Sequence, residues 1–323
     1  MTTSPQSVDR QPENAGWRLI AVVLGVWALS VLLLIAYVDR RNKPSTSAAS
    51  SEPPAAAVFP APPAGAVVFS REAGPDALAL GVVPGTRRVR VQASVVGPDG
   101  AGVRDLTTTL SLGAASASGT ACGAGCYRAE FPARGKPRFV EVSTRGSLTT
   151  RWRVVLPAAW PPESAAGMVA KSRHTWRALQ SVSFTDRLAS DPEHVVVSTW
   201  RTQAPDRLAY KIVKGYSAVV VGRQRWDKPP GGRWKRSPQQ PLTQPTPPWE
   251  SATNAHVLGT TSVGGRRGLR VSFYDPQTPG WYTVVLEPKT LRTLDLRMIT
   301  TAHFMHEVYG QFDAAPEIRA PSR

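Results

Sequence analysis

The fold is decided by residues 193–300, which open with 195-VVVSTWRTQAPDRLAYKIVKGYSAVVVGRQRW-226. Short runs rich in β-branched and aromatic residues alternate there with turn pairs such as Lys214-Gly215 and Gly264-Gly265, a pattern typical of antiparallel strands. The predicted strands are 195–200, 207–213, 218–222, 269–274, 281–287 and 291–298. The stretch therefore predicts a long antiparallel meander.

One amphipathic helix is predicted just before the meander, over residues 163–182. Pro161 and Pro162 precede it, and proline is favoured where a helix begins because its missing N–H has no partner there anyway. Apolar or small residues recur at three- and four-residue steps and form one stripe: Ala165, Met168, Val169, Ser172, Trp176, Leu179 and Val182. A helix followed by a sheet that wraps it is a container architecture.

The N-terminal part predicts a membrane anchor. Leu19–Val38 has 20 residues without a charge, which at 1.5 Å per residue spans roughly the 30 Å of one bilayer core. A cleaved signal peptide has a shorter apolar core, so we expect an uncleaved signal-anchor over residues 17–38, after a cytoplasmic tail of residues 1–16. A Pro/Ala/Ser-rich linker follows over residues 39–65.

The bulk of the chain is expected on the extracytoplasmic side of the plasma membrane, as a single-pass protein. Three basic residues follow the span and two precede it, which slightly favours a cytoplasmic C-terminal part. The short N-terminal tail and the two cysteines support an extracytoplasmic C-terminal part instead. Cys122 and Cys126, the only two in the chain, suit a local disulfide in an oxidising compartment. A metal site at the two cysteines is the alternative, but the sequence offers no second pair of ligands to complete it. Because the basic part of the chain is expected outside the cell, its formal charge of +16 is not expected to bind nucleic acid.

Residues 66–160 predict an immunoglobulin-like β-sandwich. Val89, Val91, Ala93 and Val95 alternate with polar residues, so one face of that strand should be buried. Short strands at turn-rich spacing are typical of such sandwiches: 67–70, 77–83, 88–96, 105–112, 126–131, 138–144 and 149–156.

Residues 161–315 resemble the LolA/LolB/LppX-like lipoprotein-carrier fold. The phrases 205-PDRLAYKIVKG-215, 218-AVVVGRQRWDKPPGGRW-234 and 267-RGLRVSFYDPQTPGWY-282 carry the resemblance. It implies an α+β open barrel, an antiparallel sheet curled around a helix with an apolar interior. The expected fold class is thus mainly β, with residues 316–323 as a disordered tail.

A second resemblance covers residues 66–315 and is to the extracytoplasmic region appended to some CopD-type copper transport proteins. It is carried by 121-ACGAGCYRAEF-131 and 302-AHFMHEVYGQFD-313. The chain departs from that family in having one predicted span and no polytopic core.

Large aromatic residues are expected to line an apolar cavity, since they supply wide apolar walls. The candidates are Trp176, Trp200, Tyr210, Trp226, Trp234, Trp249, Phe273 and Trp281. The alternative is that they only fill the core. Residues 237–249 hold five prolines and cannot be a central strand. They are interpreted as a lid with Trp249 packed on the body, or as a plain surface loop.

A basic run is a candidate contact for an anionic surface, because basic groups are attracted to acidic headgroups. It consists of Arg223, Arg225, Lys228, Arg233, Lys235 and Arg236, with Arg223 and Arg225 expected on one face. The alternative is a solvated charge run that protects a sheet edge.

His303, Met305 and His306 are the candidate metal ligands, since histidine and methionine suit Cu(I). The alternative interpretation of this segment is a terminal amphipathic helix that packs on the sheet through Phe304, Val308 and Phe312.

No catalytic or cofactor motif is present, so neither an enzyme nor a bound cofactor is expected. The sequence favours a membrane-anchored binding protein that holds or transfers a lipid or another apolar molecule. Its partners would be the membrane, that ligand and a transport or envelope protein. The alternatives are an accessory protein of copper handling and a structural module of the cell envelope without a ligand.

Overall fold

The computed structural model describes residues 60–322. The predicted tail (1–16), the predicted anchor (17–38) and most of the linker (39–65) therefore lie outside the described residues. Between residues 60 and 322 no helix is both long and apolar enough to cross a membrane.

Residues 67–155 form two antiparallel sheets, with strand orders β1-β2-β3-β7-β6 and β5-β4-β8-β9. The strands are β1 (Val67–Ala73), β2 (Asp76–Val83), β3 (Arg88–Val96), β4 (Thr107–Leu112), β5 (Ala115–Ser118), β6 (Thr120–Gly123), β7 (Cys126–Pro132), β8 (Phe139–Arg145) and β9 (Thr150–Val155). All seven predicted strands are present. The two that the sequence missed, β5 and β6, are only four residues long and lack an apolar pattern.

The two sheets share one apolar core. Leu80 and Val91 from the first sheet and Leu110 and Val142 from the second belong to the same buried cluster. Side chains alternate between the two faces of β3. One face carries Val89, Val91, Ala93 and Val95, and all four are buried in this core.

Residues 181–310 form one antiparallel sheet with the strand order β15-β14-β13-β12-β11-β10-β20-β19-β18-β17-β16. The strands are β10 (Ser181–Ala189), β11 (Val195–Gln203), β12 (Arg207–Ile212), β13 (Ser217–Val221), β14 (Gln224–Lys228), β15 (Lys235–Pro238), β16 (Thr253–Val263), β17 (Arg266–Asp275), β18 (Gly280–Leu286), β19 (Thr293–Thr300) and β20 (His303–Gly310).

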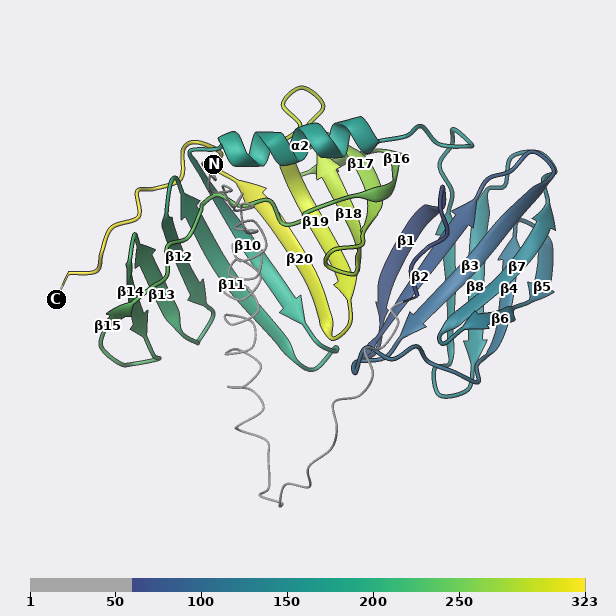
Figure 1. Ribbon diagram of the computed structural model, residues 1–323, viewed down its shortest axis with the longest axis horizontal. Helices are drawn as coiled ribbons and strands as arrows, with labels where there is room; N and C mark the ends of the chain where they lie inside the picture. The colour runs from purple at the N-terminus through teal and green to yellow at the C-terminus, as the bar shows by residue number, and fades with distance from the viewer. Residues whose placement is uncertain (1–59, 323) are drawn as a thin grey trace, which may run out of the picture. The chain divides into compact units, whose positions relative to one another are not determined.

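The prediction of a single meander is corrected by this order. Strands β10–β15, here called the first half-sheet, step outward to one edge. The chain then passes to the other edge, and β16–β20, the second half-sheet, return until β20 pairs with β10. Figure 1 shows the two half-sheets side by side. Pairing of β10 with β20 brings residues more than a hundred positions apart into register.

The proline-rich connection between the half-sheets follows the predicted behaviour. Its proline content keeps it out of the sheet, and residues 239–252 contain no strand. Trp249 is buried, and its ring contacts Phe273 edge-on at a centroid distance of 5.4 Å. The prediction that Trp249 packs back onto the body is therefore confirmed.

The predicted helix is shorter than expected: α2 comprises Ala166–Ala178. Leu179 takes an extended conformation and Ser181 already begins β10, so Val182 belongs to the sheet and not to the helix stripe. Val169, Ser172 and Trp176 are the buried helix residues, at the predicted three- and four-residue spacing.

The predicted terminal helix around Phe304 is wrong, because His303–Gly310 form the strand β20 in the interior of the sheet. Apolar residues three or four apart suggested a helix there. Phe304 and Val308 lie on one face of the strand, however, while Met305 and Tyr309 lie in the helix-side core on the other.

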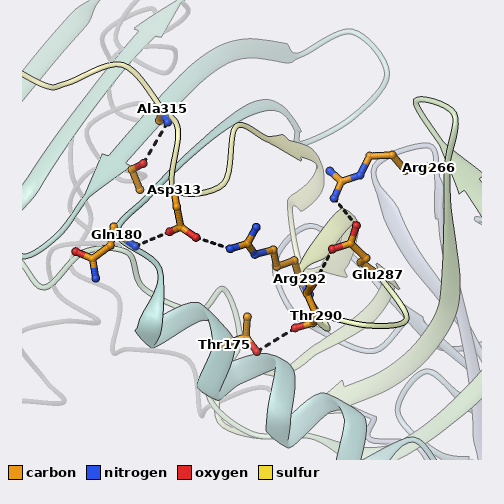
Figure 2. A network of polar contacts seen from close by, with 9 residues as sticks. Thr175, Gln180, Arg266, Glu287, Thr290, Arg292, Asp313 and Ala315 are labelled. Carbon is orange, nitrogen blue, oxygen red and sulfur yellow. Dashed lines mark hydrogen bonds and ion pairs between the residues drawn. The ribbon is translucent and has the colours of Figure 1, made fainter.

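A polar network holds the C-terminal end of α2 and the tail of the chain against the β18–β19 turn (Figure 2). The Gln180 backbone N–H donates to Asp313 at 2.8 Å, and Asp313 pairs with Arg292. Thr175 donates to the Thr290 carbonyl at 3.3 Å, and Thr290 donates to Glu287. The helix is thus fixed at this end by hydrogen bonds in addition to its apolar stripe.

Candidate functional site

A row of aromatic side chains crosses the sheet on the face that α2 covers. Tyr309, Phe184, Trp200 and Tyr210 are successive cross-strand partners on β20, β10, β11 and β12, so strand alternation places all four on one face. Trp176 of α2 meets Tyr309 edge-on at 5.1 Å. We call these five residues the aromatic row.

The rings of the row are in continuous contact. Tyr309 and Phe184 lie 5.1 Å apart, Phe184 and Trp200 stack at 5.9 Å, and Trp200 and Tyr210 lie 4.6 Å apart, measured between ring centroids. These spacings fall in the range in which aromatic pairs attract one another beyond the burial of their surface. The row is therefore a preorganised apolar strip.

Exposure changes along the row. Trp176 and Tyr309 are 3% and 6% exposed, whereas Phe184, Trp200 and Tyr210 are only half-buried. Figure 1 shows α2 over the second half-sheet, with β12–β15 extending beyond it. The row thus begins under the helix and ends where the only helix of residues 60–322 no longer covers the sheet.

A pocket of about 670 Å³ follows the same strands. Its lining takes three consecutive residues from each of β10, β11, β12 and β13, and the middle residue of the first three triplets belongs to the aromatic row. The flanking residues, among them Thr185, Thr199 and Lys211, point to the opposite face of the sheet by strand alternation. Trp234, from the β14–β15 connection, completes the lining.

An ion pair closes the far end of the row. The Arg225 guanidinium donates to both carboxylate oxygens of Asp227, at 2.9 and 2.8 Å, and to the Tyr210 hydroxyl at 3.1 Å. The Arg225 side chain is 20% exposed, so this contact lies within the protein body. The strip is apolar along its length and polar at its outer end.

Two buried carboxyl groups lie beside the row. Asp186 and Glu307 are cross-strand partners, and they follow the pair formed by Phe184 and Tyr309 on the same face. They are 7% and 3% exposed, and neither forms an ion pair within residues 60–322. Ser198 donates to Asp186 at 3.3 Å, and Trp200 donates to Ser198 at 2.6 Å. Tyr309 donates to Glu307.

Burial raises the pKa of both carboxyl groups. It raises the pKa of Asp186 to about 7, against the opposing hydrogen bonds from Ser198 and Trp200 and the nearby charge of His306. It raises the pKa of Glu307 to about 8, with a further contribution from the charge of Asp186. One oxygen of Asp186, Oδ1, has no hydrogen-bond partner among the described residues.

The eight predicted ligand-binding aromatics fall into three groups. Trp200, Tyr210 and Trp234 line the pocket. Trp176, Trp249 and Phe273 belong to the core under α2, where they fill space as the alternative interpretation held. Trp281 is buried in a separate cluster with Tyr274, and Trp226 is half-buried beneath Arg236.

The predicted basic run is dispersed over the β13–β15 region. Arg225 is the ion-paired residue described above, whereas Arg223, Lys228, Arg233, Lys235 and Arg236 are exposed. Arg223 lies in the β13–β14 turn, so the prediction that it shares a strand face with Arg225 is wrong.

The structure does not bring His303, Met305 and His306 together as a ligand set. Met305 is buried in the core under α2. His306 points to the opposite face, where its Nε2 lies 2.7 Å from Asp295. Among residues 60–322 no group of three histidine, cysteine or carboxylate side chains is placed to hold a metal ion.

The predicted disulfide is confirmed. Cys122 and Cys126 are bonded across the β6–β7 turn, with their Cα atoms 5.0 Å apart. It joins two strands of one sheet and forms a local staple, as predicted from the short spacing.

Sequence reasoning missed Phe184, Tyr309, Asp186 and Glu307. The signal for β10 was present in the alternation of Val182, Phe184 and Leu188, but the helix pattern was extended into it. The pairing of the two carboxyl groups had no local signal, because it follows from the contact between β10 and β20.

Comparison with known proteins finds distant structural similarities only. No protein-family model and no curated protein matches it. Among solved structures it is similar to LprF from Mycobacterium bovis and to lipoprotein LppX from Mycobacterium tuberculosis, each at 11% identity and a TM-score of 0.36. These matches cover 49% and 48% of this chain and 97% of each of the other chains.

A putative outer membrane lipoprotein-sorting protein domain from Vibrio parahaemolyticus matches at 8% identity and a TM-score of 0.24, over 47% of this chain and 93% of that one. These are the kinds of protein that the LolA/LppX-like resemblance named. At such identities and scores the matches carry no information on function. None of them concerns the CopD-type resemblance, which stays a prediction.

Proposed function

We propose that this chain is a binding protein that holds an apolar, lipid-class ligand on the first half-sheet. The observation that carries the proposal is the aromatic row, whose outer members Phe184, Trp200 and Tyr210 are stacked but only half-buried. A packed row that stops under a helix would be ordinary core. This row continues beyond α2 and keeps accessible apolar surface.

The proposed ligand surface is the row itself. The pocket on the same strands opens on the opposite face, because in each strand triplet the two flanking residues point away from the row. Binding sites for small molecules commonly combine apolar walls with a few polar groups. On the face that carries the row, the apolar surface is aromatic and the polar groups lie at one end, where Arg225 contacts the Tyr210 hydroxyl. An acyl chain or a similar apolar group would lie along the row, with a polar end toward Arg225.

The proposal includes the cellular setting. Residues 17–38 would anchor the chain in the plasma membrane, and the binding domain would be extracytoplasmic. The Cys122–Cys126 disulfide supports this setting, because disulfides persist in oxidising compartments. The role proposed is binding or hand-over of a ligand, not catalysis.

Native mass spectrometry of the full chain, released from membranes in a mild detergent, tests the proposal. The wild-type chain should retain a lipid-sized additional mass. The double variant Trp200→Ala, Tyr210→Ala should lose it, because the apolar contact surface is removed at the centre of the row. Trp152→Ala is the matched control, since Trp152 is also half-buried but lies on β9, away from the row and from the β10–β15 strands.

A wild-type chain that stays unliganded after incubation with mixed phospholipids would overturn the proposal. Equal retention by the double variant and the wild type would do the same, since any bound lipid would then belong to another part of the chain.

A further inference from the structure

The hairpin formed by β14 and β15 carries an excess of positive charge at one edge of the sheet. Residues 223–236, here called the basic hairpin, contain six basic residues and one acidic residue. Arg223, Lys228, Arg233, Lys235 and Arg236 are exposed. The strand order places β15 at the end of the sheet, so the hairpin forms one edge of the sheet.

The single acid does not neutralise the exposed charges. Asp227 is paired with Arg225 at 2.8 Å, on the face of the sheet that carries the aromatic row. None of the five exposed basic residues has a salt bridge within residues 60–322. The field of the basic hairpin toward solvent is therefore that of several unpaired cations.

Two tryptophans lie among these cations on the other face. Val219 pairs with Trp226, which in turn pairs with Arg236, so these side chains share one face. The Arg236 guanidinium lies 5.9 Å from the Trp226 ring centroid, and the Lys228 ammonium lies 5.9 Å from that of Trp234. Both indole rings are half-buried and keep part of their surface exposed. The surface thus alternates flat aromatic rings with cationic groups.

The turn between the strands holds this arrangement. Pro229-Pro230-Gly231-Gly232 connects β14 to Trp234, and the Gly232 N–H donates to the Pro229 carbonyl at 3.0 Å. Gly231 has φ of +67°, a conformation that glycine adopts without strain. The prolines limit the freedom of the turn, so Trp234 stays close to Lys228.

We infer that the basic hairpin docks on an anionic bilayer surface through its Trp226–Trp234 face. Indole rings concentrate at the interface between headgroups and acyl chains, and lysine and arginine stems extend past them to acidic headgroups. Charges that only protect a sheet edge need no aromatic partners on the same face. The disulfide in the same chain points to a compartment without nucleic acid.

Docking would bring the binding region close to the source of a membrane ligand. Trp234 lies on the face of the basic hairpin, beside Lys228, and the aromatic row lies on the other face of the same sheet. The inference does not depend on the proposed ligand, however, since the charge and the aromatic face are present whether or not a ligand lies on the row.

Vesicle flotation tests the inference. The full chain, held in nanodiscs of phosphatidylcholine, is mixed with vesicles of phosphatidylcholine alone or with added phosphatidylglycerol. It should float only with the anionic vesicles, and less so at high salt because screening weakens attraction between exposed charges. The triple variant Arg233→Gln, Lys235→Gln, Arg236→Gln should bind them about a hundredfold more weakly, since each basic group near such a surface contributes about a fivefold gain.

The matched control is Arg134→Gln, Lys136→Gln, Arg138→Gln, which removes the same charge from three exposed positions in the sandwich. It should keep nearly wild-type flotation. A second variant, Trp234→Ala, should weaken flotation severalfold while leaving its salt dependence unchanged, because it removes the interfacial ring and no charge.

Equal flotation with both kinds of vesicle would overturn the inference. So would an equal loss in the two triple variants, which would mean that only net charge matters. If the hairpin variant kept its binding but self-associated on gel filtration, the charges would protect the β15 edge and the inference would be wrong.

Discussion

The two half-sheets contain the same kinds of aromatic pair but differ in how far these pairs are buried. In the second half-sheet Phe273 and Tyr282 stack at 5.1 Å and are fully buried with Trp249 under α2. In the first half-sheet Phe184 and Trp200 stack at 5.9 Å and keep part of their surface exposed. The aromatic pairing is alike in both places. The two places differ in whether α2 covers the rings.

The difference has a simple geometric cause. Eleven strands at about 4.8 Å spacing make a sheet roughly 50 Å wide. A helix of 13 residues is about 20 Å long. Because α2 runs across the strands in Figure 1, it cannot cover both half-sheets. Within residues 60–322, one short helix on so wide a sheet therefore leaves the rings of Phe184, Trp200 and Tyr210 partly uncovered.

The largest effect is expected from truncating the aromatic row under the helix. Trp176→Ala should lower the free energy of unfolding by about 3–5 kcal/mol, since it leaves a large cavity and removes the 2.9 Å hydrogen bond to Thr293. Urea unfolding measures the change. Trp200→Ala, in the uncovered half, is the matched comparison and should cost clearly less. Equal losses would show that the two halves are equally packed.

A pH-dependent effect is expected from the buried carboxyl pair. Both folded pKa values are raised, so the folded state keeps protons that the unfolded state releases above about pH 4. The free energy of unfolding should therefore fall as pH rises from about 4 through 7–8 and then level off.

Asp186→Asn should flatten this dependence and raise stability at pH 8 by about 1–3 kcal/mol, because an uncharged amide costs less to bury than a carboxylate. Thermal unfolding at several pH values measures it. Glu130→Gln, at an exposed carboxyl of the sandwich, is the control and should leave the pH profile as it is. An unchanged profile in Asp186→Asn would contradict the raised pKa.

A smaller effect is expected from the network that holds the C-terminal end of α2. Asp313→Ala removes the contacts to the Gln180 N–H and to Arg292, and should cost about 1 kcal/mol because the groups are partly solvated. Hydrogen exchange should show faster exchange in the last turn of α2 and in β10. Uniform acceleration over the whole sheet would instead mean that the network supports global stability only.

The smallest effect is expected at the polar end of the row. Tyr210→Phe removes the hydroxyl that accepts from Arg225 and should change stability by about 0.5–1.5 kcal/mol. Ligand retention measured by native mass spectrometry should persist, because the ring remains. Its loss would show that the hydroxyl, and not the apolar strip, holds the ligand.

Local patterns predicted much of the fold. The strands of residues 67–155, the stripe of α2 through Val169, Ser172 and Trp176, and the burial of Trp249 all followed from periodicity and turn chemistry. The local disulfide followed from cysteine spacing. These features depend on residues close in sequence, so a single chain segment contains the information.

The errors occurred where two patterns overlap. Residues 303–310 place apolar side chains both at alternate positions and at four-residue steps, so the segment fits a strand and a helix alike. For the same reason the predicted helix was extended to residue 182, although residues 181–182 belong to β10. Pairing on both sides of β10 and β20 resolves the ambiguity, because an interior strand satisfies its backbone hydrogen bonds through its neighbours.

The sequence by itself determined that this chain forms a helix and many antiparallel strands, with aromatic and basic residues concentrated in the β10–β15 region. Only the tertiary structure decided which aromatics meet. Pairing of β10 with β20 joins Phe184 to Tyr309 and Asp186 to Glu307, and the length of α2 leaves Trp200 and Tyr210 partly uncovered. The physical reason is that register between distant strands and the reach of one helix over a wide sheet are properties of the assembled chain, which no single segment contains.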